Sequence, residues 1–144
     1  FQFSETAVAG IKYLRAMGHE VGYHSNLVTV SRASGRDPLE HLADVVREFA
    51  GLGISPLGTA SHGDAEARQG GYVNYDCLKG LDLAQLGLDH EAYFLKSEMN
   101  CDYLSDSGGN LNGKPALSLQ DFADGISALK DPSQILLHPW WWRY

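Results

Sequence analysis

The fold is decided by residues 37–63, which read DPLEHLADVVREFAGLGISPLGTASHG. Asp37 is a favourable helix cap, and Pro38 suits the first position of a helix. Apolar residues then recur with helical spacing, which predicts an amphipathic helix. A short apolar strand over 54–61 follows and leads directly into His62.

Helices and strands alternate on both sides of this stretch. Short apolar strands between helices are typical of parallel sheets that helices cover. We therefore predict an α/β fold with parallel strands, either a layered sheet or a barrel. The other predicted elements are helices over 4–17 and from 118 onward, and strands over 20–24, 93–95, 102–105 and 134–137.

The composition favours one domain, or part of one, over residues 1–144, because 144 residues with 44% hydrophobic content can bury one core. A formal net charge of −7 without basic clusters argues against a nucleic-acid partner. No apolar run is long enough to predict a membrane span. Cys77 and Cys101 lie far apart, which predicts buried thiols instead of a zinc ribbon.

The chain opens at Phe1 without an initiator Met, and we expect the natural polypeptide to start upstream. The first residues lack the layout of a signal peptide, which predicts a cytoplasmic protein. A leader upstream of Phe1 would instead predict export. The oligomeric state is left open by the sequence.

Three of the six histidines, His24, His62 and His138, end a predicted strand or follow it immediately. The carboxyl ends of parallel strands converge on the ligand site, so residues distant in sequence meet there. A catalytic zinc ion commonly takes three protein ligands, often histidines, and keeps one open position. A single histidine at a strand end is more often a hydrogen-bonded polar group. The other three histidines, His19, His41 and His90, are predicted to be solvated.

Two motifs resemble those of polysaccharide deacetylases, carbohydrate esterase family four. Residues 18–25, GHEVGYHS, are similar to that family's Gly-His-Glu-Ile-Gly-x-His-Ser/Thr segment. Residues 136–138, LLH, resemble its Leu-x-His motif. The resemblance implies that Leu136 helps to form an acetyl pocket and that His138 is the general acid.

The chain resembles more closely an uncharacterised, divergent branch of these deacetylases, in which the blocks 61–63, 103–109 and 138–142 recur. The resemblance implies a (β/α) barrel, here partial because its first strands are missing. It also implies a divalent metal ion, usually zinc, held by one aspartate and two histidines, which polarises an N-acetyl carbonyl and activates water.

Several features depart from the family pattern. The aspartate pair of the first strand has no counterpart, so we expect it upstream and expect this stretch alone to be inactive. Val28 occupies the position of the usual second histidine, and His62 is our substitute as metal ligand beside His24. The Arg-x-Pro-Tyr motif is also absent. Asp106 could contribute a carboxylate as ligand or as orienter of a histidine, or serve only as a turn cap, and Asp64 is a further candidate.

Trp140 and Trp142 could offer faces on which a sugar ring stacks, although burial explains them equally well. Residues 74–76 and Asn100 are weaker candidates for polar substrate contacts. The sequence thus favours a metal-dependent hydrolase that removes acetyl, or cleaves a related amide, from a carbohydrate. The alternative is an inactive protein of the deacetylase fold with a carbohydrate-binding or scaffold role.

Overall fold

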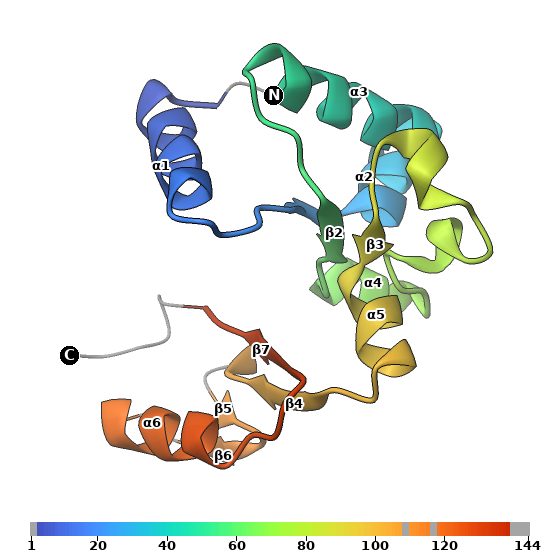
Figure 1. The fold of residues 1–144 in the computed structure, drawn as a ribbon. Helices are drawn as coiled ribbons and strands as arrows, with labels where there is room; N and C mark the ends of the chain where they lie inside the picture. The colour runs from blue at the N-terminus through green and yellow to red at the C-terminus, as the bar shows by residue number, and fades with distance from the viewer. Residues whose placement is uncertain (1–2, 108–109, 116–117, 139–144) are drawn as a thin grey trace. The chain divides into compact units, whose positions relative to one another are not determined.

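The computed structural model describes residues 3–107, 110–115 and 118–138. The chain divides into two compact units, Phe1–Tyr93 and Phe94–Tyr144, which are described separately below. Figure 1 shows the ribbon and labels the elements. Within the described residues, no helix has both the length and the apolar character to cross a membrane.

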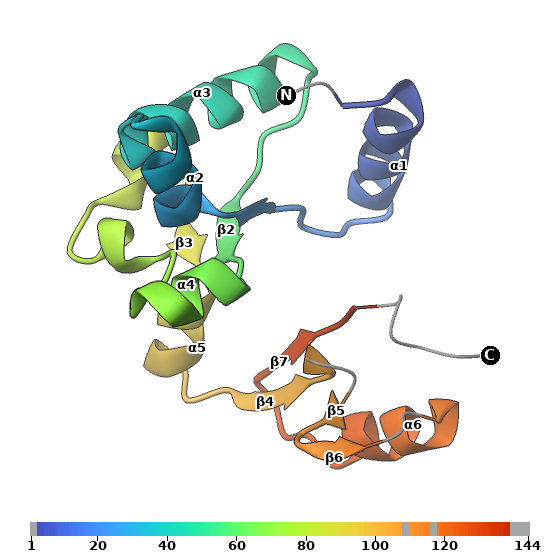
Figure 2. The same ribbon diagram turned by 180° about the vertical axis from the view of Figure 1, so that it is seen from behind.

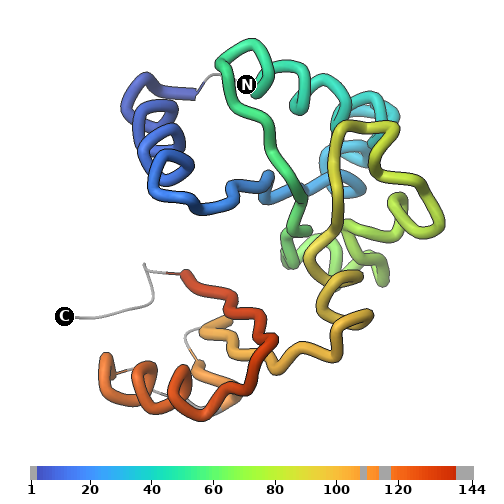
Figure 3. Tube along the Cα trace, in the orientation of Figure 1, coloured from blue at the N-terminus to red at the C-terminus, as the bar shows by residue number. Residues whose placement is uncertain are grey.

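The first unit contains a three-stranded parallel sheet in the order β1-β2-β3. His24 of β1 is paired with Ala60 of β2, and Thr59 of β2 with Glu91 of β3. Helices connect these strands, as Figure 3 shows along the chain trace. The elements are α1 (Glu5–Ala16), β1 (Tyr23–Ser25), α2 (Leu27–Ser34), α3 (Pro38–Gly51), β2 (Gly58–Ser61), α4 (Ala65–Gly70), the 3-10 helices η1 (Asp76–Leu78) and η2 (Leu83–Leu86), β3 (His90–Glu91) and α5 (Ala92–Glu98), which crosses into the second unit.

The helix ends follow from local chemistry. The Ser4 side chain accepts a hydrogen bond from the Ala7 amide at the start of α1. Asp37 does the same for the Leu39 and Glu40 amides at the start of α3. These caps confirm the two predicted helix starts.

The core of the first unit lies where α3 meets the chain leading into β2. Val45 and Phe49 of α3 and Ile54 are buried together, with exposed fractions of 3%, 4% and 0%. Helices α2 and α3 lie side by side, and Figure 2 shows them from behind. Further partly buried hydrophobic residues pack against this cluster: Phe3, Val8, Ile11, Tyr23 and Leu52.

Two glycines allow the strands of this sheet to approach closely. A Cβ atom on Gly58 would lie 2.4 Å from Nε2 of His90, and one on Gly22 would lie 2.6 Å from the Gly58 carbonyl oxygen. Neither gap can hold a methyl group without moving a ring or the backbone. Close packing against the Gly58 backbone therefore explains why a glycine stands at position 22.

The second unit is built on the parallel pair β4 (Asp102–Ser105) and β7 (Ser133–Leu136). A short antiparallel pair, β5 (Asn110–Leu111) and β6 (Lys114–Pro115), and helix α6 (Leu119–Ser127) complete it. Ser118 and Asp121 form a capping box at the start of α6, which confirms the predicted start. Buried Leu104 and Leu111 lie beside Gly125 of α6.

The mixed α/β class with parallel strands is confirmed, and a partial (β/α) barrel stays a prediction. The predicted strand over 93–95 is wrong, because these residues belong to α5. The Tyr93 amide donates to the Glu91 carboxylate at 2.7 Å, and this contact supports a helix start instead of a strand. The predicted strand over 20–24 starts three residues too early, because β1 begins only at Tyr23, where its pairing with β2 begins. Only the last four residues of predicted strand 54–61 form β2.

Candidate functional site

His24 and His62 lie next to each other at adjacent strands of the first unit. Their rings are 5.2 Å apart between centroids and nearly perpendicular, at 89°. His62 directly follows β2, as predicted, whereas His24 is the middle residue of β1 and not its last. The His62 amide donates to the carbonyl of Ser25 at 2.6 Å, which continues the contact between the two strand ends.

The His24 ring is oriented by the backbone of β2. Its Nδ1 atom lies 2.9 Å from the carbonyl oxygen of Ala60. A carbonyl oxygen only accepts hydrogen bonds, so Nδ1 is the donor, and the neutral ring carries its lone pair on Nε2. A histidine held in this way is a common arrangement for a metal ligand.

Asn74 joins the segments that follow β1 and β2. Its side chain is 1% exposed. Nδ2 donates to the Asn26 side chain at 2.6 Å and to the His62 carbonyl at 2.8 Å, while Oδ1 accepts from the Thr29 amide at 2.9 Å. A buried amide with every contact satisfied specifies one geometry. Asn74 therefore positions the backbone of His62 relative to the segment after His24.

Asp64 belongs to the same network. Its Oδ2 atom accepts from Thr29 Oγ1 at 2.8 Å and from Asn74 Nδ2 at 3.3 Å, and Oδ1 accepts from the Ala67 amide at 2.5 Å. Burial raises the pKa of Asp64, but the hydrogen bonds from Ala67, Thr29 and Asn74 outweigh it, so its pKa lies below the ordinary value. Asp64 Oδ2 also lies 3.8 Å from Nδ1 of His62.

Glu91 holds the end of β2 from the other side. Its carboxylate is 1% exposed and accepts from the Ser61 amide at 3.0 Å and from the Tyr93 amide at 2.7 Å. No local sequence pattern predicts this role of Glu91. A buried carboxylate needs such donors, and they become visible only once β2 and β3 are paired.

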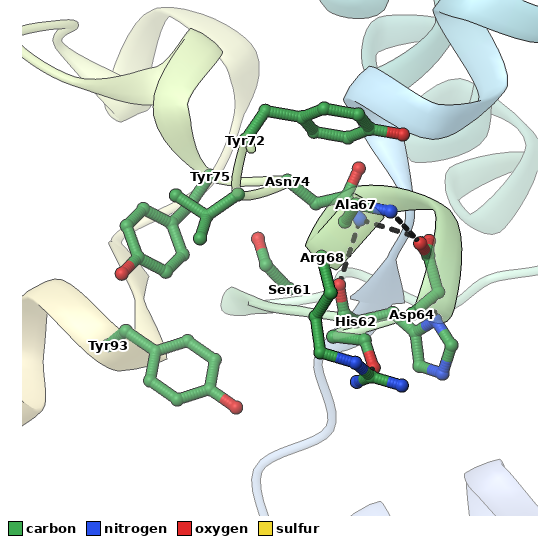
Figure 4. A pocket seen from close by; sticks show the side chains of 11 residues that line it. Ser61, His62, Asp64, Ala67, Arg68, Tyr72, Asn74, Tyr75 and Tyr93 are labelled. Carbon is green, nitrogen blue, oxygen red and sulfur yellow. Dashed lines mark hydrogen bonds and ion pairs between the residues drawn. The ribbon is translucent and has the colours of Figure 1, made fainter. Parts of the chain in front are cut away.

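A pocket of about 240 Å³ opens beside His62 and lies wholly within the first unit (Figure 4). In Figure 4 the rings of Tyr75 and Tyr93 lie on one side, and Asp64 and the His62 ring lie on the other. The full lining is Ser61, His62, Gly63, Asp64, Ala67, Arg68, Tyr72, Val73, Asn74, Tyr75 and Tyr93.

The second unit carries a histidine–carboxylate pair. Asp106 is fully buried and follows β4, and His138 follows β7 after one intervening residue. Asp106 Oδ1 accepts from the ring Nδ1 of His138 at 2.6 Å, and Oδ2 accepts from the His138 amide at 2.7 Å. The neutral ring therefore carries its lone pair on Nε2. Asp106 is thus an orienter of a histidine, one of the roles considered for it.

The remaining predicted residues have varied places. Leu136 is the last residue of β7 and is half-buried, whereas Trp140 and Trp142 lie outside the described residues. Tyr75 lines the pocket, and Asp76 pairs with Lys79 at 2.6 Å.

Asn100 adopts a left-handed turn with φ of 52°. His19 is exposed, as predicted. The prediction is wrong for His41 and His90, because His41 is half-buried on α3 and His90 is half-buried in β3, where Gly58 leaves room for its ring. Cys77 and Cys101 are free thiols, as predicted, but they are half-buried and not fully buried.

The two predicted metal ligands, His24 and His62, are neighbouring imidazoles. Two imidazoles bound to one tetrahedral zinc at about 2.0–2.1 Å have ring centres roughly 5 Å apart. The His24–His62 spacing of 5.2 Å fits that arrangement. Among the described residues, however, no group of three or more His, Cys, Asp or Glu side chains is arranged to hold a metal ion. Within the described residues, His24 and His62 therefore do not complete a metal site by themselves.

No protein-family model, no curated protein and no solved structure matches this chain. The resemblance to deacetylases therefore rests on the sequence motifs alone.

Replacing Asn74 by Leu should destabilise the first unit by about 3 kcal/mol, because it leaves the buried Thr29 amide and His62 carbonyl without their partner. The free energy of unfolding from urea titration followed by circular dichroism measures this. Gln69→Leu, the same kind of change at an exposed position of α4, should stay within about 0.5 kcal/mol of wild type. Equal stabilities for both variants would contradict the positioning role.

Asp64→Asn should make the stability of the first unit less dependent on acid pH. The lowered pKa of Asp64 means that folding favours its ionised form. That contribution is complete above the unfolded-state pKa of about 3.9 and is lost as the pH falls through the lower folded-state pKa. Urea titrations at pH 7, 5, 4 and 3 should therefore show that the difference in the free energy of unfolding between wild type and variant narrows below about pH 4.

Asp89 provides the matched control, because it is exposed and no side-chain hydrogen bond is found for it in the described part of the chain. Asp89→Asn should leave the stability close to wild type at every pH. A gap for Asp64→Asn that is constant from pH 7 to pH 3 would show that its charge is not what stabilises the network.

Proposed function

We propose that the full-length protein is a metal-dependent hydrolase of the polysaccharide-deacetylase type, with the corresponding (β/α) barrel, and that it releases acetyl from an N-acetylated carbohydrate. His24 and His62 are the proposed metal ligands, and zinc is the proposed ion. His138 is the proposed proton donor, with Leu136 beside the acetyl group.

The juxtaposition of His24 and His62 carries this proposal. The two rings lie at neighbouring parallel strands, with their centroids 5.2 Å apart, and hydrogen bonds with the backbone fix the position of each histidine. His24 is oriented by the Ala60 carbonyl, and the backbone of His62 is fixed by Asn74 and by the Ser25 carbonyl. Ligands that are positioned before the metal binds lose little freedom on binding it.

A zinc ion at such a position supplies Lewis acidity and lowers the pKa of a bound water molecule. The contribution of the protein is the placement of donor atoms. His24 offers Nε2, because Nδ1 is engaged with Ala60. Asp64 Oδ2 lies 3.8 Å from His62 Nδ1, beyond hydrogen-bond distance, and places a carboxylate near that ring.

The Asp106–His138 pair supports the role of proton donor. A buried carboxylate that accepts from both the ring and the amide of His138 sets the ring orientation and its tautomer. Only Nε2 then remains to exchange a proton with a leaving amine. The same division of roles between an orienting carboxylate and an acid–base histidine is used in other hydrolases.

A second candidate function is carbohydrate binding without catalysis. The pocket beside His62 favours it, because Tyr72, Tyr75 and Tyr93 give it aromatic walls that a sugar ring can contact. Val28 at the position of the family's second histidine also supports it. The two functions differ in whether the protein holds a metal ion.

Elemental analysis of the purified full-length protein tests this difference. We expect close to one zinc ion per chain, and loss of most of it in His24→Ala and in His62→Ala, because each removes one ligand. His19→Ala is the matched control, since His19 is exposed and is not one of the proposed ligands, and it should keep the metal. A folded protein without metal would overturn the hydrolase and leave the binding function.

Asp106→Asn should lower kcat for acetate release by about 10²–10⁴, because an amide in place of the carboxylate no longer holds His138 in the productive tautomer. Circular dichroism should show that the fold is kept, and zinc content should not change. Activity at the wild-type level in a folded Asp106→Asn protein would remove His138 from the mechanism.

A further inference from the structure

The pocket beside His62 has the size and walls of a site for a small ring. Its volume of about 240 Å³ lies below the range of about 300–1,000 Å³ typical of drug-sized ligands, and it suits a single sugar ring better. The pocket shares His62 with the proposed metal site, so a ring bound here would lie next to the reacting group.

One wall of the pocket is aromatic. The rings of Tyr75 and Tyr93 are 5.5 Å apart between centroids and tilted by 34°, and both line the pocket (Figure 4). Val73 adds an apolar surface that is 40% exposed. Flat apolar faces with polar hydroxyl edges are suited to the alternating apolar and polar surface of a sugar.

The pocket lining also includes a cation, the guanidinium group of Arg68. Arg68 of α4 lines it and is exposed, and its Nη1 atom donates to the Gly63 carbonyl at 3.2 Å. In the described part of the chain, no carboxylate forms an ion pair with Arg68. A guanidinium group carries five N–H donors, so most of its donors are available for a planar anion.

Asp64 is the other charged side chain in the lining, and its oxygens are already engaged by the protein. They accept from the Ala67 amide, the Thr29 hydroxyl and the Asn74 amide group. Figure 4 shows the Asp64 carboxylate on the side of Asn74, whereas Arg68 extends between the Tyr93 ring and the His62 ring. A carboxylate on the ligand would therefore meet Arg68 at the opening of the pocket.

We propose that this pocket binds a sugar ring that carries a carboxylate, with the ring against Tyr75 and Tyr93 and the carboxylate paired with Arg68. That the ligand is a carbohydrate rests on the proposed function. That it carries a carboxylate is inferred from Arg68 in the pocket lining. A bidentate contact between guanidinium and carboxylate would select the acid over its neutral amide.

Isothermal titration calorimetry on the full-length protein tests this after treatment with EDTA, so that binding is measured without metal. The probes are glucuronate, glucuronamide and glucose, of which only the first carries a negative charge. We expect glucuronate to bind about tenfold more tightly than glucuronamide, as one charge-assisted contact predicts. Equal binding of the acid and the amide, or no binding of glucuronate, would overturn the proposal.

Variants separate the two parts of the site. Arg68→Gln should abolish the preference for glucuronate while leaving the weak binding of glucuronamide, and Tyr75→Ala should weaken both. Arg47→Gln, at an exposed arginine of α3 that does not line the pocket, should leave both affinities unchanged. A preference that persists in Arg68→Gln would overturn the role of this arginine. Zinc content in untreated protein is measured independently, so a failure here is distinguishable from failure of the metal proposal.

Discussion

The buried side chain of Asn74 connects the two loops on which the candidate site is built. It contacts Asn26 and Thr29 after β1, and His62 and Asp64 after β2. An unsatisfied amide at 1% exposure would cost more than these contacts contribute, so the loops are held in the one arrangement that satisfies every donor and acceptor. The relative position of β1 and β2 then places the His24 and His62 rings side by side.

Buried carboxylates perform the same task elsewhere. Glu91 accepts two backbone amides and thereby determines where β2 ends and where α5 begins. Asp106 accepts the amide and the ring of His138 and determines the direction of that ring. Charged groups are rarely buried unless they are fully hydrogen-bonded. Glu91 and Asp106 accept hydrogen bonds from the segments that carry His62 and His138.

The site was predictable in part. The position of His62 directly after a strand followed from the apolar run before it, and Asp106 was recognised as a possible orienter of a histidine. No sequence pattern predicts roles for Arg68, Glu91 and Tyr93, and the pattern predicts Asn74 and Tyr75 only as weak candidates for substrate contacts. Their partners lie far away in the chain, as with Asn74 and Asn26, which are 48 residues apart. No local pattern carries such a pairing.

The sequence by itself determined the fold class and the starts of three helices, α1, α3 and α6, because caps such as Ser4, Asp37 and Ser118 and the helical spacing of apolar residues act within a few residues. It also predicted strands at β4 and β7, with β7 shifted by one residue. Only the tertiary structure decided where β1 and β2 begin and that residues 93–95 are helical, since pairing between strands and the Glu91 contact make those choices. A short apolar run fits either state until its neighbours are in place.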